Sequence, residues 1–292
     1  MTLIKRKTSI GVSMFLLFFA ANLLENLYIH QSSLLLFTSF IGLIVIMVFW
    51  HIILGGMMRF DLTVPIAHFV RSVGVALLIF AVSFGLAVGA EQALYHFLGN
   101  PGFFLRSATK YAYTSLEMAT VNNALNYPTV LVEWAGAVVS VICALFAEFL
   151  FRGLLINVGQ KSGNTYISTN VQQAIMYTLF TVAYTYIVVV RQYILHGNPT
   201  VILLSIVMLL LYTVSTFLYA FGLGVIRKTT DSIWGCVVLT FLVDFFIKDI
   251  HVTPYLPITL HCFLGLVRIS GMYCIVFLLS IPGIKQCIKR DW

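Results

Sequence analysis

Charged residues are scarce in this chain. Asp, Glu, Lys and Arg together make up 9% of its 292 residues, whereas about 25% is usual for a soluble globular domain. Hydrophobic residues make up 60%, and the mean hydropathy is +0.99. The apolar runs are continuous and about 20 residues long, as spanning helices require, and they lack the alternation of a membrane barrel. The composition therefore excludes a soluble protein and predicts an all-α, polytopic helical membrane protein.

No repeat and no Pro/Gly-rich linker divides the chain, which contains eight apolar runs. The predicted spans are residues 9–29, 33–55, 72–97, 129–151, 168–190, 200–226, 232–248 and 258–284. The first follows Lys5-Arg6-Lys7 without a clear cleavage site, so we expect a retained helix rather than a removed signal peptide. These spans predict three parts of the chain. They are residues 1–128 (three helices and an extracytoplasmic loop), 129–250 (a core) and 251–292 (the last helix and a basic tail). The loop at 98–128 is either a partner surface or a packed cap.

Basic residues are unevenly distributed between the two sides of these spans. With the N-terminus inside, twelve Lys and Arg residues lie in cytoplasmic segments: Lys5, Arg6, Lys7, Arg59, Arg71, Arg152, Lys161, Arg227, Lys228, Lys285, Lys289 and Arg290. Four lie in outer segments: Arg106, Lys110, Arg191 and Lys248. This bias predicts a multi-pass protein of the cell membrane with both termini in the cytoplasm. The net charge of +7 then indicates contact with anionic membrane lipid and needs no nucleic-acid partner.

The spacings of common metal and disulfide sites are also missing. The five cysteines form no CxxC pair, and the seven histidines form no HxxxH or HExxH pair. We therefore expect no metal and no cofactor, and we interpret the cysteines as buried structural thiols.

What the chain does have is a set of polar residues in three apolar segments of the core. The first is ALFAEFLFRGLL, Ala144 to Leu155, which contains Glu148 and Arg152. The second is LFTVAY, from 179 to 184, and the third runs from 220 to 244, with DSIWG in its middle and TFLVD at its end. Glu148 and Arg152 are four residues apart with the acid first, the favourable order for an ion pair on one helix face. Ionisable groups within a membrane mark a functional site by default.

The order of these segments resembles the CPBP family of intramembrane proteases, also called the Abi or CAAX-protease family. The family pattern is EExxxR, then FxxxH, then HxxxN or HxxxD after a small-residue helix end and a turn similar to DSIWG. The resemblance covers about residues 129–246 and implies a CAAX-protease-like helical core. It also implies that the first Glu and the FxxxH His act on water and that the third motif stabilises the oxyanion. The second Glu and the Arg are implied to form a structural pair.

Carried over to this chain, the resemblance fails at the reactive positions. Ala147 stands at the first Glu, Tyr184 at the FxxxH His and Thr240 at the third-motif His. Alanine cannot act as a base, and tyrosine, with an ordinary pKa near 10, is a poor one. Glu148, Arg152 and Asp244 remain, and we expect no catalytic residue. We expect Glu148, Arg152, Tyr184, Thr240 and Asp244 to face one another inside the bundle. They then form either a binding cavity or a packing network in which Arg152 is shared between Glu148 and Asp244.

The leading functional hypothesis is a pseudoprotease that serves as a scaffold or regulator of another membrane or cell-envelope protein, as in bacteriocin immunity. GxxxG spacing at Gly85 and Gly89 is compatible with helix–helix contact. One alternative is a divergent intramembrane endopeptidase that uses Glu148 or Asp244 as base and Tyr184 as donor. Another is a transporter, which the intramembrane acids and glycine-interrupted helix ends suggest.

Overall fold

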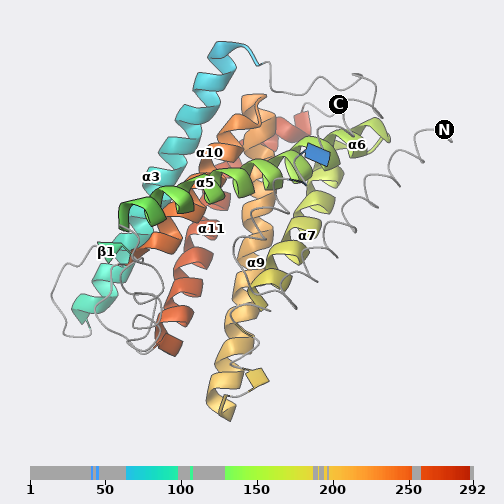
Figure 1. Cartoon of the computed structure of the whole chain (residues 1–292). Helices are drawn as coiled ribbons and strands as arrows, with labels where there is room; N and C mark the ends of the chain where they lie inside the picture. Colours follow the sequence, from blue (N-terminus) through green and yellow to red (C-terminus); the bar gives the residue numbers. More distant parts are fainter. Residues whose placement is uncertain are drawn as a thin grey trace.

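The structure is a computed structural model, and it describes residues 41, 44–45, 64–97, 106–107, 129–186, 190, 194–195, 197–251 and 258–289. Almost all of these residues are helical (Figure 1). The helices are α3 (Ile66–Phe97), α5 (Thr129–Glu148), α6 (Ile156–Lys161), α7 (Tyr166–Thr185), α9 (Pro199–Thr230), α10 (Trp234–Asp249) and α11 (Ile258–Lys289). A π-helical segment, η2 (Phe149–Leu155), joins α5 to α6. Two short strands, β1 (Arg106–Ser107) and β2 (Ile250–His251), pair antiparallel.

The all-α membrane architecture is confirmed, while the count of eight spans stays a prediction. The spans expected at 9–29 and 33–55 lie outside the described residues, apart from residues 41, 44 and 45. In the described part of the chain, four helical stretches are long and apolar enough to cross a membrane: Ile66–Ala90, Ser140–Gln160, Pro199–Thr230 and Leu266–Ile288. A shorter apolar helix covers Trp234–Phe246. The helix expected at 168–190 is described as α7 over Tyr166–Thr185, and it is not one of the four stretches. Its N-terminal half contains the polar residues Thr169, Asn170 and Gln173, which are buried inside the bundle.

The helix boundaries follow from local sequence chemistry. The Thr165 side chain caps α7 by accepting the Ser168 N–H, and Asn198 caps α9 by accepting the Val201 N–H, with Pro199 in the first turn. These caps satisfy backbone donors that have no partner inside the helix. At the other end of α9, Asp231 adopts a left-handed conformation with φ of 51°. This residue begins the DSIWG turn that leads into α10.

Packing centres on α9, whose most extensive contacts are with α11 and then with α7. Helix α10 packs against α3 and α5. Figure 1 shows α5 and α6 running across the long helices rather than parallel to them. This crossing brings η2 against the middle of the bundle, and all seven residues of η2 are buried.

The turn before α10 fixes the close approach of α10 to α3. The Ser232 hydroxyl accepts the Trp234 N–H at 3.2 Å and lies 3.1 Å from the Ser72 hydroxyl, to which it is hydrogen-bonded. A Cβ on Gly235 would lie 2.6 Å from the Ser72 carbonyl oxygen, so only glycine permits this contact. The contacts of Ser232 and Gly235 with Ser72 therefore hold the start of α10 against α3. They also set the position of Thr240 further along α10.

Candidate functional site

The ion pair predicted from the sequence forms at the junction of α5 and η2. Arg152 Nη1 lies 3.0 Å from Glu148 Oε1, and both side chains are fully buried. A buried charge is costly unless it is paired and hydrogen-bonded. Arg152 lies within the π-helical segment η2. Because such segments are frequent at functional sites, the backbone conformation also indicates a candidate site here.

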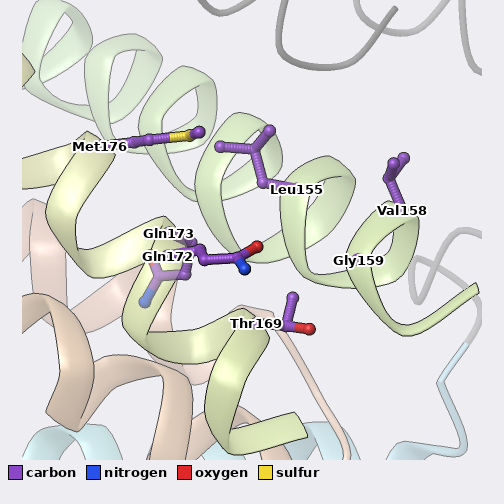
Figure 2. Close-up of a pocket in the computed structure, with 7 residues that line it drawn as sticks. All are labelled: Leu155, Val158, Gly159, Thr169, Gln172, Gln173 and Met176. Atoms are coloured by element: carbon purple, nitrogen blue, oxygen red, sulfur yellow. The ribbon is translucent and has the colours of Figure 1, made fainter. Parts of the chain in front are cut away.

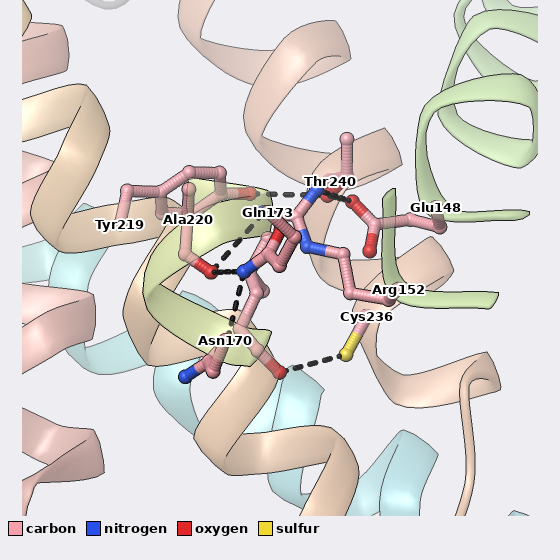
Figure 3. Close-up of polar contacts among 9 residues, drawn as sticks. Glu148, Arg152, Asn170, Gln173, Tyr219, Ala220, Cys236 and Thr240 are labelled. Atoms are coloured by element: carbon pink, nitrogen blue, oxygen red, sulfur yellow. Dashed lines mark hydrogen bonds and ion pairs between the residues drawn. The ribbon is translucent and has the colours of Figure 1, made fainter. Parts of the chain in front are cut away.

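Helix α10 supplies the second partner of Glu148. The Thr240 hydroxyl donates to Glu148 Oε1 at 2.8 Å, and the Tyr219 hydroxyl on α9 lies 3.2 Å from Thr240 Oγ1. Since the single hydroxyl hydrogen of Thr240 points to the carboxylate, Tyr219 is the donor in the second bond. A chain of hydrogen bonds thus runs from Tyr219 through Thr240 to Glu148 (Figure 3).

Arg152 also contacts α7 and α9. Its Nη2 donates to the Ala220 carbonyl at 3.3 Å, and its guanidinium carbon lies 4.3 Å from the centre of the Tyr177 ring. A guanidinium over an aromatic face is stabilised by the negative charge of that face. The cation is therefore held from three sides by Glu148, the α9 backbone and Tyr177.

One short stretch of α9 accepts five side-chain hydrogen bonds through its backbone carbonyls. Besides the Arg152 bond, the donors are Gln173 to Ala220 at 3.0 Å, Asn170 to Phe221 at 3.0 Å, Cys236 to Leu223 at 3.2 Å, and Tyr166 to Gly224. This access needs small residues on α9, because a Cβ on Gly224 would collide with the Asn170 amide. The stretch therefore acts as the polar centre on which η2, α7 and α10 converge (Figure 3).

The comparison with protein families agrees with this geometry. Residues 129–246, which are 118 of the 292 residues, match the family model described as type II CAAX prenyl endopeptidase Rce1-like. This segment is similar to the Rce1-like endopeptidases. The match confirms the CPBP resemblance that the three motifs predicted. No curated protein and no solved structure matches the chain.

Within residues 129–246, the structure brings together three of the six predicted motif residues. Glu148 Oε1 is in direct contact with both Arg152 and Thr240. Asp244, half-buried one turn further along α10, lies near enough to Glu148 for their charges to interact. The expected sharing of Arg152 with Asp244 is wrong, because the second Nη of Arg152 bonds the Ala220 carbonyl instead.

The other two motif positions are Ala147 and Tyr184. Ala147 is half-buried and packs against the hydrophobic core. Tyr184 belongs to α7, but its side chain lies outside the described part of the structure. The Phe180 anchor of the same motif packs against Phe146 and Phe151, with ring centres 6.4 and 6.0 Å apart.

Three polar atoms of the network lack a hydrogen-bond partner among the described residues. They are Glu148 Oε2, Arg152 Nε and Gln173 Oε1. In the same part of the chain, no group of three or more His, Cys, Asp and Glu side chains is arranged to hold a metal ion. The network can therefore fix helix packing. Glu148 Oε2 is the carboxylate oxygen that could still accept a proton or a hydrogen bond.

Sequence reasoning missed Tyr219, Gln173 and Asn170. A signal for the last two was present, because Tyr166, Asn170 and Gln173 are four and three residues apart and so share one face of α7. These side chains meet the backbone of α9 beside the small residues Ala220 and Gly224. Tyr219 had no such signal, since an aromatic residue in an apolar helix is usually a packing residue.

Proposed function

We propose that this chain is a catalytically degenerate CPBP-family membrane protein that acts as a scaffold or regulator of another membrane or cell-envelope protein. The observation that carries the proposal is the bond from Thr240 to Glu148 at 2.8 Å. At this position the family pattern has a histidine, whereas here a hydroxyl is committed to the neighbouring carboxylate.

The remaining groups are poorly suited to peptide hydrolysis. A general base must reach a water molecule, and an oxyanion needs free donors aimed at it. Glu148 is completely buried and paired with Arg152, while Ala147 has no titratable group. Thr240 has used its only hydrogen on Glu148, so it offers no donor to an oxyanion.

The surface of the helices supports a role in membrane contacts. Large apolar side chains are exposed on α3, α7, α9 and α11, among them Leu78, Leu179, Leu203 and Leu278. Such faces are suited to lipid and to other transmembrane helices. The partner in this proposal is a membrane or envelope protein, and immunity to a bacteriocin is one regulatory setting of this kind.

Quantitative cross-linking in native membranes tests the scaffold role. A defined partner should cross-link to the wild type and, at equal amounts of folded protein, to the same extent to Glu148→Gln, because this change removes the base. It also leaves the buried Arg152 cation without its anion, so the folding of the variant is measured first. The proposal is contradicted if the intact chain stays monomeric and partnerless in its native membrane. It is equally contradicted if Glu148→Gln folds normally but loses the partner.

A divergent intramembrane endopeptidase is the alternative. It is favoured by Glu148 Oε2, which lacks a hydrogen-bond partner among the described residues. Under this alternative Glu148 is the base, and Tyr219 replaces Tyr184 as the hydroxyl connected to it through Thr240. Replacement of Glu148 by Gln then abolishes cleavage, whereas it changes no cleavage under the scaffold proposal.

A further inference from the structure

Helix α7 has the length of a membrane span but a polar N-terminal half. Its 20 residues, Tyr166–Thr185, are enough to cross a bilayer, and none of them is Asp, Glu, Lys or Arg. By length and composition, however, α7 is not among the four described stretches that could cross a membrane. Two of its buried side chains, Asn170 and Gln173, are amides, so the question is what makes them compatible with a membrane.

The buried donors of α7 are hydrogen-bonded to a helix that comes later in the chain. Asn170 and Gln173 each donate to a backbone carbonyl of α9 at 3.0 Å, and Tyr166 donates to the Gly224 carbonyl. The three acceptors lie 51, 47 and 58 residues after their donors. Because a chain is synthesised from its N-terminus, these acceptors reach the membrane after α7 does.

The elements that precede α7 supply no acceptor for its two amides. Gln173 and Thr169 lie opposite Leu155 and Gly159, which belong to η2 and α6 (Figure 2). Among the described residues of η2 and α6, however, none accepts a hydrogen bond from Asn170 or Gln173. Thr169 needs no such partner, since its hydroxyl donates to a backbone carbonyl one turn earlier at 3.0 Å. The amides of α7 therefore depend on α9.

This dependence has a cost when α9 is absent. An amide without a hydrogen-bond partner is unfavourable in hydrocarbon, where no water replaces the missing partner. Gln173 also donates to Asn170 at 2.8 Å, so the two amides act as one polar unit. The contact of α7 with α9 is more extensive than its contact with any other described element. Gly224 permits this contact, because a Cβ there would collide with the Asn170 amide.

We propose that α7 is a dependent span, which is held in the membrane only when α9 is packed against it. The carbonyls of α9 then serve as an intramolecular partner for the insertion of α7. Because Arg152 donates to the same Ala220 carbonyl that accepts from Gln173, the Glu148–Arg152 network is completed in the same step. The proposal does not rest on the scaffold role, since it concerns the assembly of the bundle alone.

Thiol labelling of the full-length chain tests the dependence. Asn164→Cys lies in the turn before α7 and Thr200→Cys at the start of α9, and each is introduced singly after the native cysteines are replaced by serine. In the otherwise native chain, a membrane-impermeant reagent should label the two from opposite sides. Gly224→Val separates α7 from α9 without making α9 more polar. It should shift the ratio of the two orientations of Thr200→Cys, toward the side of Asn164→Cys, by about threefold or more, the equivalent of one interhelical hydrogen bond. An unchanged ratio overturns the proposal, as does labelling of both positions from one side in the native chain.

Two further variants separate insertion from folding. Asn170→Leu together with Gln173→Leu removes the amides that need α9. Added to Gly224→Val, this pair should return Thr200→Cys to its native side, although the protein still unfolds more easily in detergent because the bonds to α9 are lost. Gly85→Val is the matched control, since a Cβ on Gly85 has no heavy atom within 4 Å, and it should leave the labelling unchanged. Failure of the leucine pair to restore the native side, or an equal shift in Gly85→Val, contradicts the dependence.

Discussion

Thr240 donates a 2.8 Å hydrogen bond to Glu148 across 92 residues of sequence. The contact joins α10 to the end of α5 and places two positions of the CPBP motif side by side. It also gives the buried carboxylate a second partner besides Arg152. The predictions below follow from this connection and from the packing that holds it.

The first prediction concerns the ion pair itself. Arg152→Met should destabilise the protein by about 3–5 kcal/mol, because the carboxylate of Glu148 stays buried without its cation. Detergent-solubilised protein can be compared by thermal or denaturant unfolding. Adding Glu148→Gln to Arg152→Met should restore part of the loss, since the unpaired charge is then gone. Equal stability of Arg152→Met and the wild type contradicts a structural role for the pair.

The second prediction concerns the hydrogen-bond chain from Tyr219 through Thr240. Thr240→Val keeps the shape but removes the hydroxyl, and should cost about 1–3 kcal/mol, because a buried charged acceptor loses a donor. Tyr219→Phe should cost less, since its bond is between neutral groups. The double variant should cost less than the sum of the two, because both changes interrupt the same chain. Strict additivity in the unfolding measurement would show that the two bonds are independent.

The third prediction concerns the contact between α10 and α3. Gly235→Ala should destabilise the fold by about 1–3 kcal/mol, because its Cβ would lie 2.6 Å from the Ser72 carbonyl oxygen. Gly85→Ala is the matched control, since a Cβ there has no heavy atom within 4 Å. It should leave stability unchanged or slightly higher. Similar unfolding curves for the two variants would contradict the close approach of the helices.

The fourth prediction concerns orientation in the membrane. Asn164 lies in the exposed turn between α6 and α7, and Thr200 is exposed at the start of α9. From the distribution of basic residues, Asn164→Cys should react with a membrane-impermeant thiol reagent only from the cytoplasmic side, and Thr200→Cys only from the outer side. The native cysteines are first replaced by serine. Labelling of both positions from one side contradicts the proposed topology.

The helical fold and the resemblance of residues 129–246 to the family could be predicted from the sequence because both depend on local patterns. Long apolar runs and the four-residue spacing of Glu148 and Arg152 do not depend on how the helices pack against one another. The network around them could not be predicted, because it depends on which backbone carbonyls become accessible when helices pack. Gln173 and Tyr219 join it only because small residues on α9 and the crossing of α5 bring them within reach.

The same reasoning explains the one wrong contact. Asp244 lies one helical turn from Thr240 on α10. Charge alone therefore predicts that Arg152 pairs with both Asp244 and Glu148. The guanidinium instead faces the Ala220 carbonyl and the Tyr177 ring. Backbone carbonyls and ring faces are acceptors that sequence-based charge pairing does not count.

The central claim, that Glu148 is a structural rather than a catalytic carboxylate, is tested most directly by comparing cleaved protein termini. Native membranes that contain equal amounts of folded wild type or Glu148→Gln are incubated, and new termini in the membrane proteins are profiled by mass spectrometry. Because every membrane protein is surveyed at once, the measurement works without a chosen substrate. The account predicts identical profiles. A set of cleavage sites that occurs with the wild type and disappears with Glu148→Gln would contradict it and establish a divergent endopeptidase.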